Sequence, residues 1–136
     1  MSEKVLVIDD DAGIRNLFEN ILKMDGYTVV KASNGPEALQ ILEQEKINII
    51  LMDIQMPEMT GLELCPKVKQ LVPAAICIAI TGYASIFDLV SCREAGFDDY
   101  YEKPIHFDTL REIVENAQKT IARWKKKSVP SNSLSA

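Results

Sequence analysis

The chain has 136 residues, of which 47% are hydrophobic and 26% are charged. This fits one globular domain with a single core, and the net charge of −5 argues against nucleic-acid binding, which requires a basic face. No apolar run is long enough to span a membrane, and the first residues lack the features of a secretory signal, so we expect a cytoplasmic protein.

The first half of the chain alternates predicted strands and helices. Val5–Ile8 predicts a strand, and the helix after it ends near Gly26. The apolar face of that helix is formed by Ile14, Leu17, Phe18, Ile21 and Leu22. Tyr27–Lys31 predicts the second strand, and the next helix opens with Asn34 as its N-cap and Pro36 in its first turn.

The alternation continues through the second half. Ile47–Met52 predicts the third strand, and the helix expected within Thr60–Leu71 contains Pro66. Because proline is tolerated only near the start of a helix, this helix should begin late or bend. Ile76–Ile80 and Asp99–Glu102 predict the last two strands.

Two further helices complete the pattern. One runs from about Ser85 to Ala95 and stops at Gly96, and the last runs from about Asp108 to Lys126. We expect a folded domain over residues 1–124 and a polar, disordered tail or linker remnant over residues 125–136. The basic end of the last helix suits the helix dipole, and nucleic-acid contact is the weaker alternative.

The three cysteines, Cys65, Cys77 and Cys92, form no CxxC motif and cannot all pair with one another. Cys77 lies within an apolar run. We therefore expect small buried thiols, as in a reducing compartment.

The predicted strands are continuously apolar rather than alternating, which indicates burial on both faces. Together with the regular alternation of strand and helix, this predicts an α/β fold with a parallel sheet between two layers of helices. In such folds the ligand site lies at the carboxyl ends of the strands.

Polar residues follow four of the predicted strands. Asp9-Asp10-Asp11 follows the first strand, Asp53 the third, Thr81 the fourth and Lys103 the fifth. Clustered carboxylates repel one another unless a cation lies among them, and a few oxygen ligands favour Mg²⁺ or Mn²⁺. A carboxylate beside such an ion can attack phosphorus while a hydroxyl and an ammonium bind the other phosphoryl oxygens.

Four segments, "VLVIDDD", "ILMDIQMPEMTGLEL", "AITGYAS" and "AGFDDYYEKPI", carry a family resemblance. From about Lys4 to Arg123 the chain resembles the receiver domain of the response regulators of two-component signalling. The resemblance implies a flavodoxin-like (CheY-like) three-layer sandwich with five helices and a five-stranded parallel sheet of order 2-1-3-4-5.

The same resemblance implies roles for the acidic residues. Asp53 is the phosphoacceptor. Asp10 and Asp53 bind Mg²⁺ directly together with the backbone carbonyl of Gln55, and Asp9 acts through water. The alternative for Asp53 is a helix cap without any chemical role, but Met56-Pro57 lies between Asp53 and the next predicted helix. Asp11 is the better candidate for a helix cap.

Further roles are implied at the other strand ends. Thr81 and Lys103 bind phosphoryl oxygens, and the Lys103–Pro104 peptide bond is cis. Tyr100 is the switch aromatic that turns inward when Thr81 moves, although it could simply pack against a helix. Gln55 and Tyr83 flank the acyl phosphate.

Two other side chains, Phe87 and His106, can be explained without a functional role. Phe87 on the fourth helix is either a partner contact or an ordinary exposed apolar residue. His106, the only histidine, is expected to be a solvated loop residue.

These expectations predict a phosphorylation-dependent switch. A histidine kinase, a phosphotransfer protein or a small phosphodonor would phosphorylate Asp53, and the surface of the fourth helix, fifth strand and fifth helix would then change and control an output partner or dimerisation. The chain would catalyse only its own phosphorylation and dephosphorylation. The alternatives are a Mg²⁺-dependent phosphatase with an aspartyl-phosphate intermediate, a flavin-binding electron carrier, and an unphosphorylated interaction module.

Overall fold

The structure, a computed structural model, describes residues 3–82 and 86–134, and the side chains of these except at 86–87 and 127–134. The expectations for Tyr83, for Ser85 as a helix start and for the side chain of Phe87 therefore lie outside the described residues.

Within the described residues, five parallel strands form one sheet in the order β2-β1-β3-β4-β5, as predicted. The strands are β1 (Lys4–Ile8), β2 (Thr28–Ala32), β3 (Ile49–Met52), β4 (Ile76–Thr81) and β5 (Asp99–Glu102). The helices between and after them are α1 (Ala12–Lys23), α2 (Gly35–Gln44), α3 (Gly61–Leu71), α4 (Ile86–Ala95) and α5 (Phe107–Leu134).

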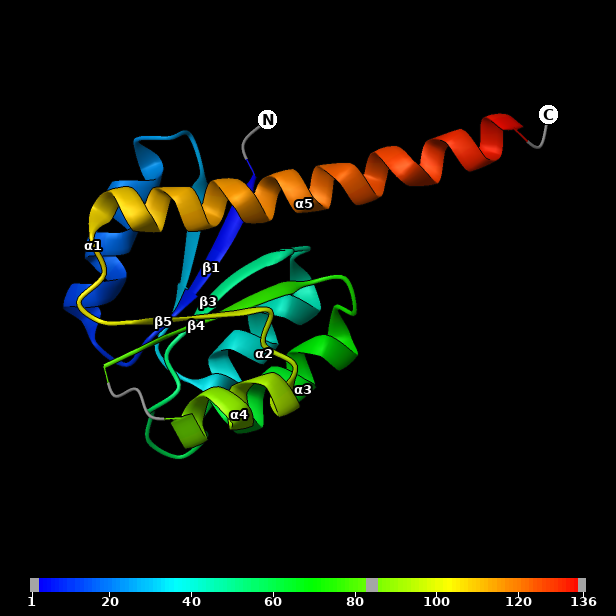
Figure 1. The fold of residues 1–136 in the computed structure, drawn as a ribbon. Helices are drawn as coiled ribbons and strands as arrows, with labels where there is room; N and C mark the ends of the chain where they lie inside the picture. Colours follow the sequence, from blue (N-terminus) through cyan, green and yellow to red (C-terminus); the bar gives the residue numbers. More distant parts are fainter. Residues whose placement is uncertain (1–2, 83–85, 135–136) are drawn as a thin grey trace.

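The sheet lies between two layers of helices, with α1 and α5 on one face and α2, α3 and α4 on the other (Figure 1). Neighbouring residues of β3 alternate between two apolar clusters: Ile50 and Met52 pack on the α2, α3 and α4 side, whereas Ile49 and Leu51 pack on the α1 and α5 side. All four are at most 1% exposed, which explains why the strand sequences are continuously apolar.

The helix starts follow local capping rules. The side chain of Asp11 caps α1 by accepting hydrogen bonds from the backbone N–H groups of Gly13 and Ile14. Asn34 caps α2 and Pro36 lies in its first turn, as predicted. The predicted burial of all three cysteine thiols is also confirmed.

Of the two alternatives predicted for α3, the late start is wrong, and a bend at Pro66 stays a prediction. The helix does not begin late but starts at Gly61, with Pro66 inside it. A capping box explains this early start: Glu63 N–H donates to Thr60 Oγ1, and the Glu63 carboxylate accepts from Thr60 N–H.

The last helix is longer than the sequence suggests. We expected an end near Lys126, but α5 continues to Leu134 and projects beyond the sheet (Figure 1). Extending an existing helix costs far less than nucleating one, so the polar residues after Lys126 do not stop it. The domain boundary near residue 124 stays a prediction. None of the described helices is long and apolar enough to cross a membrane.

Candidate functional site

The carboxyl ends of β1 and β3 bring two aspartates together. Ile8 and Met52 are register partners at the ends of these neighbouring strands, so Asp9 and Asp53 follow at adjacent positions. The Asp53 N–H donates to Ile8 O at 2.9 Å, which continues the sheet pairing as far as the acidic residues. The backbone pairing of the two parallel strands therefore places Asp9 beside Asp53, independently of any side-chain contact.

Asp10 joins the same cluster. One carboxylate oxygen from each of Asp9, Asp10 and Asp53 lies within 4.8 Å of the other two. Asp9 and Asp53 are buried, at 3% and 7% exposure, whereas Asp10 is exposed. The predicted acidic cluster is therefore present, with one open side.

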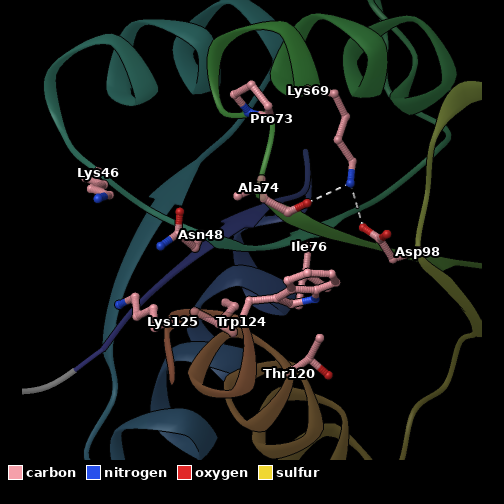
Figure 2. Close-up of a pocket in the computed structure, with 12 residues that line it drawn as sticks. Lys46, Asn48, Lys69, Pro73, Ala74, Ile76, Asp98, Thr120, Trp124 and Lys125 are labelled. Atoms are coloured by element: carbon pink, nitrogen blue, oxygen red, sulfur yellow. Dashed lines mark hydrogen bonds and ion pairs between the residues drawn. The ribbon is translucent and has the colours of Figure 1, made fainter. Parts of the chain in front are cut away.

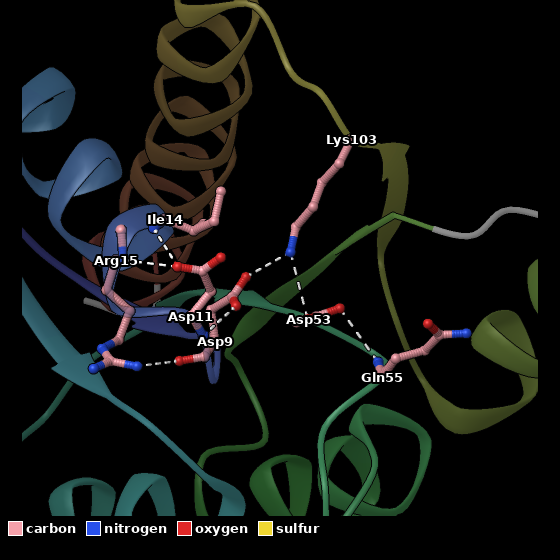
Figure 3. A network of polar contacts seen from close by, with 8 residues as sticks. Asp9, Asp11, Ile14, Arg15, Asp53, Gln55 and Lys103 are labelled. Atoms are coloured by element: carbon pink, nitrogen blue, oxygen red, sulfur yellow. Dashed lines mark hydrogen bonds and ion pairs between the residues drawn. The ribbon is translucent and has the colours of Figure 1, made fainter.

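Lys103 reaches the two buried carboxylates from the other side (Figure 3). Its Nζ lies 2.7 Å from Asp9 Oδ2 and 3.4 Å from Asp53 Oδ2. The other oxygen of Asp53, Oδ1, accepts the Gln55 backbone N–H at 3.2 Å. Both oxygens of Asp53 are thus held by hydrogen-bond donors.

Burial and charge shift the protonation of this pair in predictable directions. Burial, followed by the negative charge of Asp9, raises the pKa of Asp53, while Lys103 and the Gln55 N–H partly oppose the rise. Burial alone would lower the pKa of Lys103, but the hydrogen bond that Lys103 donates to Asp9 and the charges of Asp53 and Asp9 outweigh it, so this pKa is raised. Lys103 therefore stays charged and offsets the buried carboxylates.

The donor set fits a small divalent cation. Three carboxylates that share one open side repel one another, and Lys103 supplies a single positive charge. Oxygen ligands of this kind, with space for water, are what Mg²⁺ and Mn²⁺ use. Asp9, Asp10 and Asp53 are the residues that could hold such an ion.

Thr81 lies at the same edge of the sheet. It is the last residue of β4, its side chain is fully buried, and its backbone carbonyl accepts the Lys103 N–H at 2.7 Å. The Lys103–Pro104 peptide bond is cis, as the sequence led us to expect. The structure thus brings Thr81 and Lys103 to the edge that carries the aspartates.

Tyr100 lies apart from the acidic cluster. It pairs with Ala79 inside the sheet and packs against the apolar cluster on the α2, α3 and α4 side. Its hydroxyl is buried and has no hydrogen-bond partner among the described residues, and burial raises the pKa of this tyrosine. Unpartnered buried hydroxyls are rare and costly, so this position is unusual whatever its role.

Two residues of the site were missed by the sequence reasoning. Arg15 donates from Nη1 to Asp9 O at 2.6 Å; an arginine on the first turn of the helix after an acidic triplet was the available signal. Gly61 lies so close to the site that an added Cβ would be 2.6 Å from Asp53 O and 2.9 Å from Ile54 Cα. The glycine of "MPEMTGLEL" marked it.

Comparison with known proteins agrees with this architecture. The response regulator receiver domain model matches residues 5–115. The alkaline phosphatase synthesis transcriptional regulatory protein PhoP of Bacillus subtilis (strain 168) is 36% identical over 135 residues, covering 98% of this chain and 54% of that protein. Sporulation initiation phosphotransferase F of the same organism is 31% identical over 115 residues, covering 85% of this chain and 93% of that protein.

Solved structures show the same similarity. A response regulator receiver domain protein (CheY-like) from Methanospirillum hungatei JF-1 has a TM-score of 0.82 at 34% identity and covers 93% of this chain and 99% of that one. This chain spans only 30% of the transcriptional regulatory protein GlrR of Escherichia coli (strain K12), with which it is 31% identical.

Proposed function

The chain belongs to the response regulator receiver domain family, and we propose that it is a phosphorylation-dependent signalling switch whose phosphoacceptor is Asp53. One observation carries the proposal: the Asp53 carboxylate lies at the mouth of β3 between Lys103 and two further carboxylates. No other described cluster joins three carboxylates in this way.

Asp53 would accept the phosphoryl group as a nucleophile. A carboxylate oxygen attacks phosphorus, a P–O bond to Asp53 forms, and the bond from phosphorus to the donor breaks. The donor is the phosphohistidine of a kinase or phosphotransfer protein, whose imidazole leaves, or a small acyl phosphate, whose carboxylate leaves.

The residues around Asp53 would stabilise the added charge. Lys103 already lies 3.4 Å from Asp53 Oδ2, so its ammonium is placed to pair with a phosphoryl oxygen. We assign the second such contact to the Thr81 hydroxyl. Asp9, Asp10, Asp53 and the backbone carbonyl of Gln55 would hold Mg²⁺ or Mn²⁺; when bound, the ion offsets the charge of the carboxylates and of the incoming phosphoryl group.

The signal would leave the site through Thr81 and Tyr100. A shift of Thr81 toward the phosphoryl group opens space beside β4, and Tyr100, on the neighbouring strand, turns inward. The Tyr100 hydroxyl has no hydrogen-bond partner among the described residues, which supports this, because a second side-chain position in which the hydroxyl is hydrogen-bonded would be lower in free energy. The surface formed by α4, β5 and α5 changes as a result.

That surface would control the output. The partners are a downstream protein or domain, or a second copy of the chain, and the acidic net charge gives no reason to expect direct nucleic-acid contact. The chain would act in the cytoplasm, and it would process no external substrate.

Intact mass after incubation with acetyl phosphate tests the proposal. We expect a gain of one phosphoryl group that requires Mg²⁺ and is absent in Asp53→Asn. Asp11→Asn is the matched control: asparagine also caps helices, and Asp11 lies outside the acidic cluster, so this variant should be phosphorylated normally. A wild-type chain that binds Mg²⁺ but gains no mass would leave only an unphosphorylated interaction module.

A further inference from the structure

A cavity of about 450 Å³ lies at the opposite edge of the sheet from Asp53. It is formed by the segments that lead into β3, β4 and β5 and by the middle of α5 (Figure 2). Asn48 precedes β3, Ala75 precedes β4, Asp98 precedes β5, and Trp124 comes from α5. A volume of this size is in the range that small organic ligands occupy.

An aromatic side chain dominates the apolar part of the cavity. The Trp124 indole extends from α5 into the space near Ile76, with Pro73 on the far side (Figure 2). Trp124 is 70% exposed, although large aromatic rings gain more from burial than other side chains. A planar ring laid on this indole would remove apolar surface of both partners from water.

The charged part of the cavity has an excess of positive charge. Lys69 and Asp98 neutralise each other, with Nζ and Oδ2 2.8 Å apart, and Lys69 also donates to Ala75 O. Lys46 and Lys125 lie on the other side of the cavity, with the Asn48 side chain between them in the view (Figure 2). The ammonium of Lys46 forms no ion pair or hydrogen bond with any described residue.

The nearest acidic side chains do not cancel this charge. Glu43 and Glu45 line the hollow next to the cavity together with Lys46. Glu45 is paired with Lys4 at 2.9 Å, and among the described residues Glu43 forms no ion pair with Lys46. Inside the cavity, Asp98 is held by Lys69 and by the Cys77 N–H at 2.8 Å. A cation would therefore find no unpaired carboxylate among the cavity residues, whereas an anion would find the unpaired ammonium of Lys46, with Lys125 as a second cation on the same side.

From these features we propose that the cavity is a binding site for a small planar aromatic anion. The ring lies on Trp124 with Ile76 and Pro73 around it, and a carboxylate or phosphate on the ring pairs with Lys46 and Lys125. The site is independent of Asp53, which lies at the other end of the strands.

The test uses 2-naphthoate as the probe and the neutral 2-naphthalenemethanol as its matched analogue. Because Trp124 is the only tryptophan, its indole N–H gives one signal in an amide NMR spectrum of the full chain. We expect 2-naphthoate to shift this signal saturably with a Kd of about 1 mM or below. The neutral analogue should bind at least about fivefold more weakly, and added salt should narrow that difference.

Substitutions test the assignment of each contact, with binding measured by calorimetry. Lys46→Gln and Lys125→Gln should each weaken 2-naphthoate binding about two- to fivefold, as expected for exposed ion pairs. Trp124→Ala should weaken it about tenfold through loss of the ring contact. Lys119→Gln is the control: Lys119 is on the same helix but pairs with Glu115 at 3.1 Å and does not line the cavity.

The possible results of these measurements distinguish between support for the proposal and its failure. The proposal is overturned if the Trp124 signal does not move, if the neutral analogue binds as tightly as 2-naphthoate, or if Lys119→Gln weakens binding as much as Lys46→Gln does. Asp53→Asn should bind 2-naphthoate like wild type, so failure of the phosphorylation experiment would leave this result unchanged.

Discussion

Lys103 contacts Asp9 more closely than Asp53, with its Nζ 2.7 Å from Asp9 Oδ2 and 3.4 Å from Asp53 Oδ2. The three side chains are only 19%, 4% and 8% exposed, respectively. The ammonium of Lys103 thus forms its shorter hydrogen bond with Asp9 and its longer, weaker contact with Asp53. Such an arrangement leaves Lys103 positioned for a group added to Asp53 without breaking its stronger bond.

A double-mutant cycle with Lys103→Gln and Asp9→Asn should report a coupling energy of about 1–3 kcal/mol, because the hydrogen bond is charge-assisted and largely buried. Urea unfolding of the four proteins without added metal measures it. The Lys4–Glu45 pair is the control, since it has a similar length of 2.9 Å but exposures of 42% and 37%; its coupling should stay below about 1 kcal/mol. Equal coupling in both cycles would contradict the importance of burial.

Gly61→Ala should destabilise the protein by about 1–3 kcal/mol and slow phosphorylation of Asp53. The new Cβ would meet Asp53 O at 2.6 Å, and a backbone atom at that distance must move. Gly82→Ala is the matched control at the same edge of the sheet, because its Cβ would meet only Lys103 Cδ, at 4.0 Å. Urea unfolding and the intact-mass assay would show the contrast; a neutral Gly61→Ala would refute the close approach.

The pairing of Asp25 with Arg111 should make stability depend on pH below neutrality. Arg111 donates to both oxygens of Asp25 at 2.8 Å, and this hydrogen bonding lowers the pKa of Asp25 despite some desolvation. A lowered carboxyl pKa contributes stability above the pKa of the unfolded chain, and that contribution is lost as the pH falls through the folded value.

Wild type and Asp25→Asn should therefore differ in free energy of unfolding at neutral pH and converge as the pH drops below about 4. Denaturant titrations across this range measure the difference. Arg111→Gln should flatten the profile in the same way, since it removes the other partner. A difference that persists unchanged in acid would show that the ion pair does not cause it.

Tyr100→Phe should leave stability unchanged or raise it by up to about 1 kcal/mol, because it removes a buried hydroxyl that has no hydrogen-bond partner in the part of the chain that the structure describes. Tyr101→Phe provides the comparison on the next residue of β5. There the hydroxyl donates to Asp99 Oδ2 at 2.7 Å, so its removal should cost about 0.5–1.5 kcal/mol. Thermal or urea unfolding would decide, and a clear loss of stability in Tyr100→Phe would mean that its hydroxyl is bonded.

The family resemblance implied the strand order, and the pattern of parallel strands predicted that Asp9, Asp10, Asp53, Thr81 and Lys103 lie at one edge of the sheet. Parallel strands put their carboxyl ends at one edge, so any polar residue just after a strand must arrive there. The preference of Lys103 for Asp9 depends instead on side-chain packing, which strand spacing does not determine.

The predicted start of α3 and the predicted end of α5 differ from the structure because one local sequence preference outweighs another. Pro66 alone indicated a late start or a bend, and of these the late start is wrong because the capping box of Thr60 and Glu63 sets the start of α3 at Gly61. The polar composition after Lys126 suggested an end to α5, but polar residues do not stop a helix that is already formed. The cavity near Trp124 combines three loops with one helix, and no sequence pattern indicates such a surface.

Pro66→Ala should stabilise the protein by about 1–3 kcal/mol. Pro66 is the sixth residue of α3, so its ring crowds the carbonyl of Leu62 one turn earlier and its missing N–H leaves that carbonyl without its helical donor. Alanine restores the donor and removes the crowding.

Pro36→Ala is the matched control, because Pro36 lies in the first turn of α2, where no helical donor is needed and the fixed φ favours the helix. This change should be neutral or slightly destabilising. Urea midpoints that move in the same direction for both variants would show that Pro66 places no strain on α3. If only Pro66→Ala stabilises the protein, then Pro66 destabilises α3, and the capping box of Thr60 and Glu63 compensates for this at the start of the helix.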